Sequence, residues 1–283
     1  MKHNLVVCGT SGEETGRLGA FGFRDYLKAQ GIVLDEMMVT EPSLCTPVYA
    51  HKGTVRLTYE IKGRAAHSSK PHLGANALVA AAQLITALDE EHERMQRERT
   101  GPLGAPTLTP TLSAGGHGLN IVPESAYVSV DYRVTTPGAE GVSEDVDEVF
   151  ARLSAIADKV LVDNKHCTGY EVSGSWVPVV CVSVLTHSNF QVVNLNQDNL
   201  SGNPAFFQDP SHPFVKQLEG WTDLKAETVT YGTNATGYDA SVMKACCICG
   251  PGDIEQAHMA DEFVAVEQLV KFETVLASWL SLE

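Results

Sequence analysis

Two adjacent carboxylates, Glu13 and Glu14, lie in a glycine-flanked turn that directly follows the apolar run NLVVC. Like charges this close repel each other, so the pair is costly unless a cation or a proton compensates it. A metal ion would explain the pair, because one carboxylate can bind the cation while its neighbour accepts a proton from metal-bound water. A plain surface pair is the simpler alternative, and the pair alone does not exclude it.

Two more candidate ligands follow predicted strands elsewhere in the chain. Glu41 comes after the run DEMMVT, and His258 comes a few residues after the run KACCIC. Ligands of open α/β sheets gather outside the carboxyl ends of the strands, so parallel neighbours would bring Glu14, Glu41 and His258 together. Carboxylate oxygen and imidazole nitrogen are ligands of hydrolytic zinc. Taken singly, each residue is better explained as part of a solvated loop, and only their joint position at one sheet edge favours metal-dependent hydrolysis.

Composition narrows the possible partners. The chain has 283 residues, 43% of them hydrophobic, and a net charge of -15, which argues against nucleic acid or an anionic membrane as a partner. No run approaches the roughly 18 apolar residues that a membrane span needs. Seven cysteines at irregular spacing do not indicate a disulfide framework, so we expect a cytoplasmic protein. Cys246, Cys247 and Cys249 share one apolar run, where burial in the core is a better expectation than soft-metal binding.

Both ends of the chain show the pattern of an open α/β sheet. NLVVC reads as a short buried strand, and GRLGAFGFRDYLKAQG has apolar residues at helical spacing, with Gly31 as the stop signal. DEMMVTEP and KACCICGPG predict further strands, and DEFVAVEQLVKFETVLASWL predicts the last helix. Strands that alternate with helices in this way predict a sheet covered by helices.

The middle of the chain predicts an inserted α+β domain. GTVRLTYEIKG and SAYVSVDYRV alternate, and their apolar faces consist of Val55, Leu57, Tyr59 and Ile61 in the first run and Val128, Val130 and Tyr132 in the second. LGANALVAAAQLITALDEEHERM predicts a long amphipathic helix, and SEDVDEVFARLSAIADK a second helix with Ser143 as its N-cap. The resulting order β-α-β-β-α-β is that of a ferredoxin-like sandwich.

These patterns divide the chain into three parts. Residues 1–50 plus 205–283 are expected to form a metal-binding catalytic domain of the α/β class. Residues 51–172 form the inserted ferredoxin-like domain, and residues 173–204 an irregular connection in which Asn, Gln and Ser are frequent.

Five stretches of the chain together resemble a known family of dinuclear-zinc amidohydrolases and metallopeptidases. The family includes acetylornithine deacetylase, succinyl-diaminopimelate desuccinylase, aminoacylase and glutamate carboxypeptidase. The stretches are TSGEETGRLGA, TEPS, AHKGTVRLTYEIKGRAAHSSKPHLGANAL, GGHGLNIVPESAYVSVDYR and GPGDIEQAHMADEFV. The HKG, AHSSKP and GPGDIEQAH variants are most similar to acetylornithine deacetylases. The resemblance implies a zinc-peptidase-like catalytic domain with an open mixed sheet, and an inserted domain that pairs two protomers into a homodimer.

The resemblance also implies a role for each metal-site residue. Glu13 matches the general base, and Glu14 and His258 match the ligands of one zinc ion. Glu41 matches a ligand of a second zinc ion. The family holds two zinc ions per active site, although the same ligand types suit cobalt or manganese.

Other residues match the substrate site of the family. His67 matches a histidine that reaches the active site of the partner subunit and hydrogen-bonds the developing oxyanion. Asn120 and Arg133 match a pair that contacts the substrate's carboxylate or carbonyl, and Gly250 and Gly252 are expected to contact substrate as well. Without the resemblance, His67 would read as a loop residue, Asn120 as a turn residue and Arg133 as solvent-exposed.

The family pattern includes a His-x-Asp motif and a bridging aspartate ahead of the paired carboxylates, and this sequence contains no His-x-Asp. We therefore expect an N-terminally incomplete chain. The expected function is metal-dependent hydrolysis of the amide bond of an N-acyl amino acid. The alternative is a catalytically impaired fragment, or a non-catalytic dimerising relative that lacks the second metal site.

Overall fold

The structure is a computed structural model that describes residues 4–13, 17–136, 143–174, 182–184 and 202–280. The chain divides into two compact units. Unit 1 contains the described residues within Met1–Lys52 and Ala205–Glu283, and unit 2 those within Gly53–Gly138 and Ser143–Pro204. None of the helices in these described ranges is long and apolar enough to cross a membrane.

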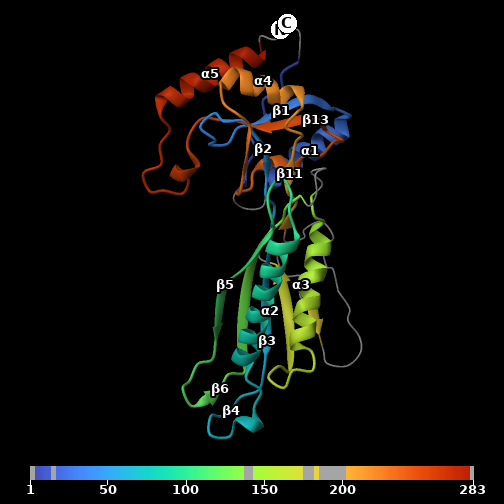
Figure 1. Ribbon diagram of the computed structural model, residues 1–283, viewed down its shortest axis with the longest axis vertical. Helices are drawn as coiled ribbons and strands as arrows, with labels where there is room; N and C mark the ends of the chain where they lie inside the picture. The colour runs from blue at the N-terminus through green and yellow to red at the C-terminus, as the bar shows by residue number, and fades with distance from the viewer. Residues whose placement is uncertain (1–3, 14–16, 137–142, 175–181, 185–201, 281–283) are drawn as a thin grey trace. The chain divides into compact units, whose positions relative to one another are not determined.

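Unit 1 is built on an open mixed sheet (Figure 1). Its strands are β1 (Leu34–Val39), β2 (Val48–His51), β11 (Phe206–Phe207), β12 (Glu227–Val229) and β13 (Met243–Ile248). The strand order is β1-β13-β2-β11, and β12 also pairs with β2. The pairs β1–β13 and β12–β2 are parallel, whereas β2 runs antiparallel to β13 and β11. The helices are α1 (Leu18–Gln30), α4 (Pro213–Thr222), α5 (Val266–Leu280) and the short helices η2 (Asn234–Gly237) and η3 (Ile254–Gln256).

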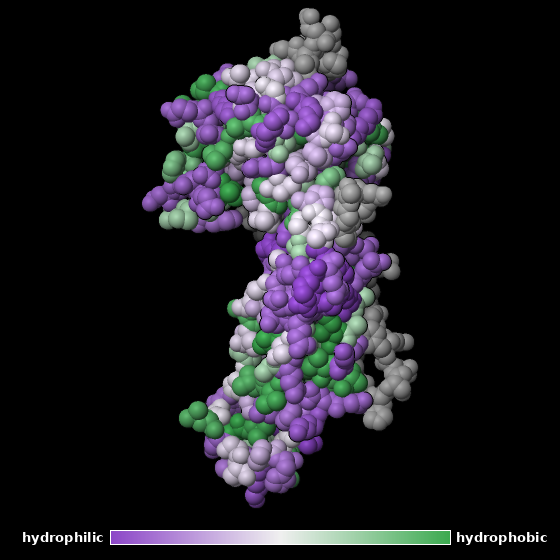
Figure 2. Space-filling view, viewed as in Figure 1, coloured by the Kyte–Doolittle hydropathy of each residue, from purple (hydrophilic) through white to green (hydrophobic). Residues whose placement is uncertain are grey.

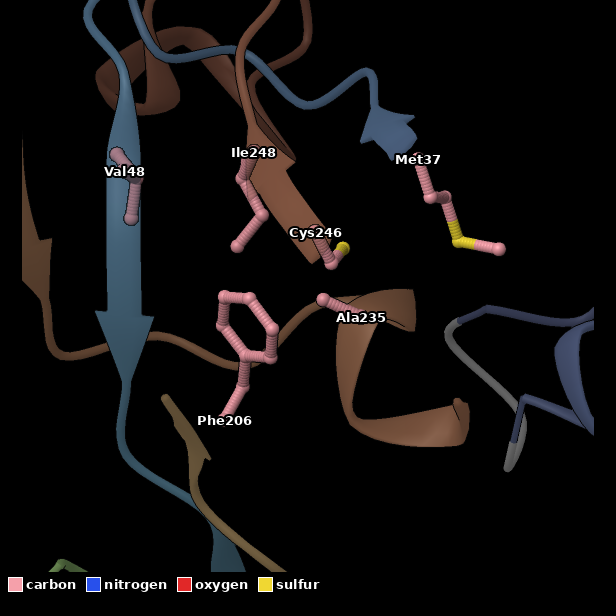
Figure 3. Packing of buried hydrophobic residues seen from close by; sticks show 6 residues of the cluster. All are labelled: Met37, Val48, Phe206, Ala235, Cys246 and Ile248. Atoms are coloured by element: carbon pink, nitrogen blue, oxygen red, sulfur yellow. The ribbon is translucent and has the colours of Figure 1, made fainter. Parts of the chain in front are cut away.

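Strand β13 separates the two cores of unit 1, because its side chains alternate between the faces of the sheet. Cys246 and Ile248 pack with Met37, Val48, Phe206 and Ala235 on one face, where α1 contributes Phe23 (Figure 3). Ala245 and Cys247 pack on the other face against α4 and α5. All three cysteines of this run are fully buried, as predicted, and burial raises the pKa of each thiol. They are therefore small core residues.

The prediction that NLVVC forms a first strand is wrong. Residues 4–12 form no strand, and Leu5, Val6 and Val7 are exposed. A strand needs a neighbour that completes its ladder of hydrogen bonds. Among the described residues, β1 pairs on one side only, with β13, and residues 4–10 are not hydrogen-bonded into the sheet. Helix α1, by contrast, ends where predicted, with Gly31 in the left-handed region at φ 63°.

Unit 2 is an antiparallel sheet with two long helices (Figure 1). The main sheet has the order β5-β7-β3-β8-β9, and β10 pairs with β3. Its strands are β3 (Thr54–Lys62), β5 (Thr107–Gly115), β7 (Ser125–Arg133), β8 (Gly169–Gly174), β9 (Val182–Val184) and β10 (Gly202–Asn203). A separate pair consists of β4 (Ala66–His67) and β6 (Ile121–Val122), and the helices are η1 (Pro71–Leu73), α2 (Ala77–Glu98) and α3 (Val146–Leu161). The inserted ferredoxin-like α+β fold and the α/β fold of unit 1 are thus as predicted.

The alternation predicted for the two central strands of unit 2 is confirmed. Val55, Leu57, Tyr59 and Ile61 of β3, and Val128, Val130 and Tyr132 of β7, are all at most 1% exposed. These residues form the face of the sheet that α2 and α3 cover, and the two helices lie side by side (Figure 1).

The visible surface of the molecule is mostly hydrophilic, with hydrophobic residues in separate patches (Figure 2).

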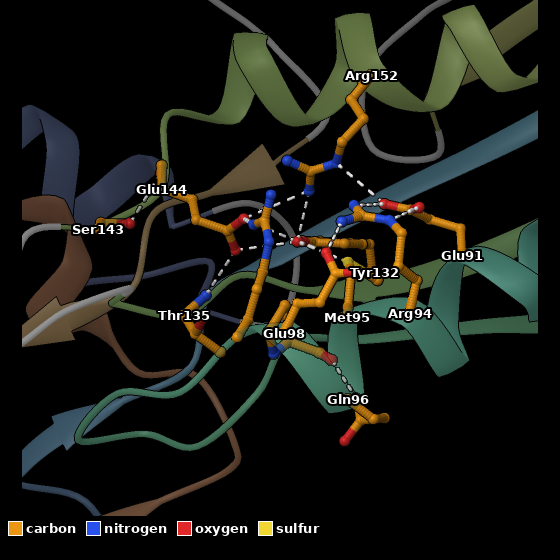
Figure 4. A network of polar contacts seen from close by, with 12 residues as sticks. Glu91, Arg94, Met95, Gln96, Glu98, Tyr132, Thr135, Ser143, Glu144 and Arg152 are labelled. Carbon is orange, nitrogen blue, oxygen red and sulfur yellow. Dashed lines mark hydrogen bonds and ion pairs between the residues drawn. The ribbon is translucent and has the colours of Figure 1, made fainter.

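A buried carboxylate organises the entry to α3 (Figure 4). Glu144 accepts hydrogen bonds from the Tyr132 hydroxyl at 2.9 and 3.0 Å and from the Thr135 backbone N–H at 3.2 Å, and Arg99 and Arg152 form ion pairs with it. Helix α3 begins after Asp145, whose carboxylate accepts from two backbone N–H groups. The prediction of Ser143 as the N-cap is therefore wrong, since its hydroxyl donates to the Glu144 carbonyl instead.

The connection predicted for residues 173–204 contains short pieces of the sheet where it is described. Strand β8 continues to Gly174, and β9 and β10 lie within this range. Residues 175–181 and 185–201 lie outside the described residues.

Candidate functional site

Glu13 is held by a nearby cation. Its carboxylate accepts a hydrogen bond from Arg17 Nε at 3.0 Å, and 30% of its side chain is exposed. The Arg17 backbone N–H donates to the Gly12 carbonyl at 2.7 Å, which closes the turn that carries Glu13. Gly19 of α1 packs against the backbone of Ser11, where an added Cβ would lie 2.5 Å from two backbone atoms. This turn is therefore fixed by a glycine and an ion pair. Glu14 lies outside the described residues.

Glu41 follows β1 and is joined to the turn that follows β13. A Cβ on Gly250 would lie 2.5 Å from the Glu41 carbonyl oxygen, so only glycine allows this approach. The Gly250 carbonyl accepts from the Cys45 N–H at 2.8 Å, and the Gly252 carbonyl accepts from the Leu44 N–H at 2.7 Å. In the structure these two glycines bind the Glu41 loop through their backbones. Their predicted contact with substrate remains a prediction.

His258 lies six residues after Gly252 of this joined turn, beyond η3. It is exposed, and its backbone adopts the left-handed region at φ 64°, an uncommon conformation for a residue with a side chain. Because β1 and β13 are parallel neighbours, Glu41 and His258 both follow strands that end at the same edge of the sheet. Within the described ranges, no group of three or more His, Cys, Asp or Glu residues has the geometry of a metal site.

One cavity of unit 1 contains both Glu13 and Glu41. Its volume is about 1120 Å³, and its other lining residues include those of β1, residues 4–6 and 8–10, Asn234 and Tyr238. His258 is not among its lining residues. The structure thus brings the predicted base and one predicted ligand to a common cavity, and it does not bring His258 there.

A buried histidine supports the Asn234 side of this cavity. His51 is fully buried, and burial lowers its pKa to about 4. Its Nδ1–H donates to the Lys52 carbonyl at 2.9 Å, so its Nε2 accepts from the Thr233 hydroxyl at 3.1 Å. Thr233 in turn accepts from the Ala235 N–H and caps η2, which begins at Asn234. Asn234 donates to Thr10 at 3.2 Å, and its buried Oδ1 has no partner among the described residues.

Tyr231 is a candidate that the sequence analysis did not single out. Burial, followed by the charges of Glu41, Glu227 and Asp253, raises its pKa to about 12. The phenol is therefore protonated at neutral pH and offers a hydrogen-bond donor near Glu41. From the sequence, only its place in the run YGTNA, three residues before Asn234, could have indicated Tyr231.

His67 and Asn120 lie together in unit 2. Strands β4 and β6 pair antiparallel, with His67 opposite Ile121, the residue after Asn120. The Asn120 carbonyl accepts from the Ser68 N–H at 2.9 Å. His67 and Asn120 are both exposed. Two residues that are 53 positions apart are thus joined by one short ladder, as a shared role at one site requires.

Arg133 lies at the other end of β7 from Asn120. Its Nε donates to Asp131 at 2.6 Å, and Asp131 also accepts from Arg56 at 2.9 Å. Asn120 precedes the first residue of β7 and Arg133 is its last, and a nine-residue strand is about 27 Å long. The predicted pair of Asn120 and Arg133 is therefore not assembled within one protomer. Arg133 is also partly covered, with 32% of its side chain exposed, rather than plainly exposed.

Comparisons with known proteins agree with the fold. Residues 49–165 match a family model described as the peptidase dimerisation domain. These residues are less than half of the chain, so the match identifies this region as similar to a peptidase dimerisation domain.

The particular relatives are similar over most of this chain. Acetylornithine deacetylase of Vibrio cholerae is 28% identical over 271 residues, which are 93% of this chain and 61% of that protein. Acetylornithine deacetylase of Proteus mirabilis is 27% identical over 270 residues, which are 93% and 59% of the two chains. The chain therefore spans about 60% of the length of the curated relatives that it matches.

Solved structures show the same fold. The aminopeptidase PepT from Bacillus cereus has a TM-score of 0.65 at 15% identity, and a tripeptidase from Staphylococcus aureus has a TM-score of 0.64 at 19% identity. In both comparisons the match covers 95% of this chain and 61% of the other chain.

Proposed function

We propose that this protein takes part in the metal-dependent hydrolysis of the amide bond of an N-acyl amino acid. The observation that supports the proposal most is the parallel pairing of β1 with β13, which are followed by Glu41 and His258, while Glu13 and Glu41 line one cavity. Open α/β sheets bind ligands at such an edge. The curated relatives named acetylornithine deacetylase make an N-acetyl amino acid the first substrate to test.

The metal is proposed from the chemistry of its donors. Glu41 and His258 offer a carboxylate and an imidazole, which suit zinc and also cobalt or manganese. Glu14, the third proposed ligand, lies outside the described residues, and the described part of the chain alone supplies fewer than three clustered donors. A divalent ion bound here would polarise the substrate carbonyl and lower the pKa of a bound water. Two ions per site is the expectation from the family.

The proton chemistry is proposed for Glu13. Its carboxylate would take a proton from the attacking water and return it to the leaving amine. Arg17 holds the carboxylate at 3.0 Å and so fixes its position in the cavity. The planar guanidinium of Arg133 would bind a substrate carboxylate, and a donor on His67 would meet the negative charge that develops on the carbonyl oxygen.

The geometry of unit 2 favours a homodimer with shared sites. His67 and Asn120 lie near one end of β7 and Arg133 lies at the other, about 27 Å away along the strand. A single substrate of amino-acid size cannot contact both ends in one protomer. We propose that His67 and Asn120 act at the active site of the partner protomer, and that Arg133 acts at a different site from the one that His67 and Asn120 of its own chain reach.

The second candidate is a non-catalytic dimerising relative. It is favoured by the absence of a three-donor cluster within the described ranges. Such a protein would retain the paired unit 2 and bind at most one weak metal ion. Six cysteines in the described ranges are free thiols, which supports a reducing, cytoplasmic location for either candidate.

One experiment separates the two candidates. The purified chain is stripped with a chelator and reloaded with zinc, cobalt or manganese, and its metal content and its hydrolysis of N-acetylornithine and other N-acetyl amino acids are measured. Two metal ions per chain and metal-dependent turnover would support the hydrolase and contradict the non-catalytic relative. Glu13→Gln should keep the metal and lose turnover by about 100-fold or more, whereas Glu273→Gln, a matched exposed change on α5, should do neither. One weak ion and no turnover with any substrate would favour the non-catalytic relative.

A further inference from the structure

The imidazole of His67 is held by the residue two positions further on. The Ser69 backbone N–H donates to His67 Nδ1 at 3.2 Å, and the Ser69 hydroxyl oxygen lies 2.8 Å from the same nitrogen. A backbone amide can only donate, so Nδ1 must act as the acceptor and carry no proton. The hydroxyl then also donates to Nδ1.

We infer that Ser69 is a positioning residue that fixes His67 as the tautomer with its proton on Nε2. Nε2 has no partner within the described ranges, so this tautomer presents an N–H donor outward. The other neutral tautomer would present a lone pair at Nε2 and would repel a negative oxygen. The inference adds a residue to the proposed function and rests on it for the catalytic consequence, whereas the tautomer itself does not depend on it.

The surrounding backbone keeps Ser69 in place. The Lys70 N–H donates to the His67 carbonyl at 2.8 Å, which folds residues 67–70 into a turn. The Ser68 N–H donates to the Asn120 carbonyl at 2.9 Å, and His67 pairs with Ile121 across the β4–β6 ladder. The first two residues of the turn are therefore tied to the segment that carries Asn120. The orientation of the ring and the position of Asn120 are set by the same short piece of backbone.

The chemical benefit is preorganisation. A donor aimed at developing charge lowers the barrier only if it needs no rearrangement during the reaction. An unconstrained neutral imidazole exchanges its proton between both nitrogens, so part of the population would lack the donor at the time of reaction. Two hydrogen bonds to Nδ1 remove that fraction. The effect is expected on the chemical step and not on substrate binding.

The direct test is nuclear magnetic resonance of the ring nitrogens in the full-length, 15N-labelled chain at alkaline pH, where imidazoles are neutral. His67→Gln assigns the signals. We expect a protonated Nε2 and an unprotonated, hydrogen-bonded Nδ1. We expect Ser69→Ala to raise the fraction with the proton on Nδ1, Ser69→Thr to restore the wild-type pattern, and Ser68→Ala, in the same exposed turn, to change nothing. A proton on Nδ1 in the wild type, or identical spectra for Ser69→Ala and Ser68→Ala, would overturn the inference.

Kinetics adds the catalytic readout. Ser69→Ala should lower kcat about tenfold at an unchanged KM, because a donor used only in the transition state affects kcat. Ser69→Thr should recover most of the loss. A chain that shows the expected tautomer but hydrolyses no amide would keep the inference and reject the proposed function. A chain that hydrolyses amides equally well with Ser69→Ala would keep the proposed function and reject the role of Ser69.

Discussion

The two candidate regions of this molecule are assembled in different ways. In unit 2, His67 and Asn120 are joined by one short antiparallel ladder and a backbone hydrogen bond. In unit 1, Glu13, Glu41 and His258 follow different segments and depend on the order and direction of strands in the sheet. Both residues of β4 pair with both residues of β6, and all four are described. The sheet edge of unit 1 joins Glu41 to the Gly250 turn, and among the described residues β1 pairs on one side only.

This difference indicates which parts of a site are self-contained. A turn that is closed by its own backbone hydrogen bonds keeps its geometry without help from distant segments. A site at strand ends depends on every strand that positions it. The following changes test this contrast, beginning with the largest expected effect.

Mixed dimers test whether the two regions meet across protomers. If each site uses Glu13 from one protomer and His67 from its partner, Glu13→Gln and His67→Ala are each inactive alone. A dimer with one of each contains one intact site, and it should regain about half of wild-type activity. Differently tagged chains are co-expressed, and the mixed dimer is isolated by two affinity steps and assayed.

The control for the mixed dimer is a dimer in which both chains carry the same substitution. A mixed dimer of two differently tagged Glu13→Gln chains should remain inactive. If the Glu13→Gln and His67→Ala mixture is as inactive as its parents, both residues act within one protomer or have no catalytic role, and the contrast between the two regions loses its functional meaning.

Gly250→Ala tests whether the stability of unit 1 depends on the close contact between Gly250, after β13, and the Glu41 backbone, after β1. The new Cβ would lie 2.5 Å from the Glu41 carbonyl oxygen and 3.0 Å from its backbone nitrogen, and backbone cannot move aside cheaply. We expect a loss of about 3 kcal/mol in the free energy of unfolding. Urea unfolding followed by tryptophan fluorescence measures it, because Trp221 and Trp279 pack in a unit 1 core.

The matched control is Gly22→Ala in α1, where an added Cβ meets nothing within 4 Å. Alanine in a helix should stabilise by about 0.5–1 kcal/mol. Equal effects of the two substitutions would mean that the Gly250 contact does not shape the site.

His51 allows a test by pH. Burial holds its folded pKa near 4, against about 6.5 in the unfolded chain, so the unfolded state binds the proton first as pH falls. The His51 contribution to stability is present above pH 6.5 and is lost progressively toward pH 4. Between pH 8 and pH 5 we expect about 2 kcal/mol of loss from this group.

The comparison with His51→Gln isolates that contribution. The variant should lose less stability than wild type over the same pH range, as measured by tryptophan fluorescence in urea. His72→Gln, an exposed change in unit 2, should leave the pH dependence of unit 1 as it is in wild type. A parallel pH dependence for wild type and His51→Gln would contradict the buried neutral imidazole.

The fold could be predicted where one face of an element is fully buried. The alternation in β3 and β7 and the buried cysteines of β13 are local patterns, and the left-handed Gly31 is a local stop signal. The run NLVVC has the same apolar pattern as a strand, but its state depends on a neighbour that the pattern does not contain. Local sequence therefore predicts what an element buries, and not whether a partner is there.

For the candidate site, the sequence motifs point to individual residues but not to the distances and contacts between them. The motifs identify His67 and Asn120, but their distance from Arg133 follows from the register of β7, which no motif encodes. Tyr231 gains its importance from the carboxylates of distant segments, and Gly250 from contact with Glu41. The pairs Glu41–Tyr231 and Glu41–Gly250 are 190 and 209 positions apart, so they require the folded sheet.

The smallest expected effect concerns the start of α3, where the sequence pattern identified the wrong residue. The Asp145 carboxylate accepts from the Asp147 N–H at 2.7 Å and from the Glu148 N–H at 3.1 Å, so Asp145→Ala should cost about 1 kcal/mol. Ser143→Ala removes a hydrogen bond from the hydroxyl to the Glu144 carbonyl and leaves the Asp145 cap in place, so it should change stability by less than about 0.5 kcal/mol. Hydrogen exchange of the α3 amides measures both effects within unit 2. If Ser143→Ala cost more than Asp145→Ala, the helix would be capped as the local pattern alone suggests, and unit 2 would be less self-contained than its ladder implies.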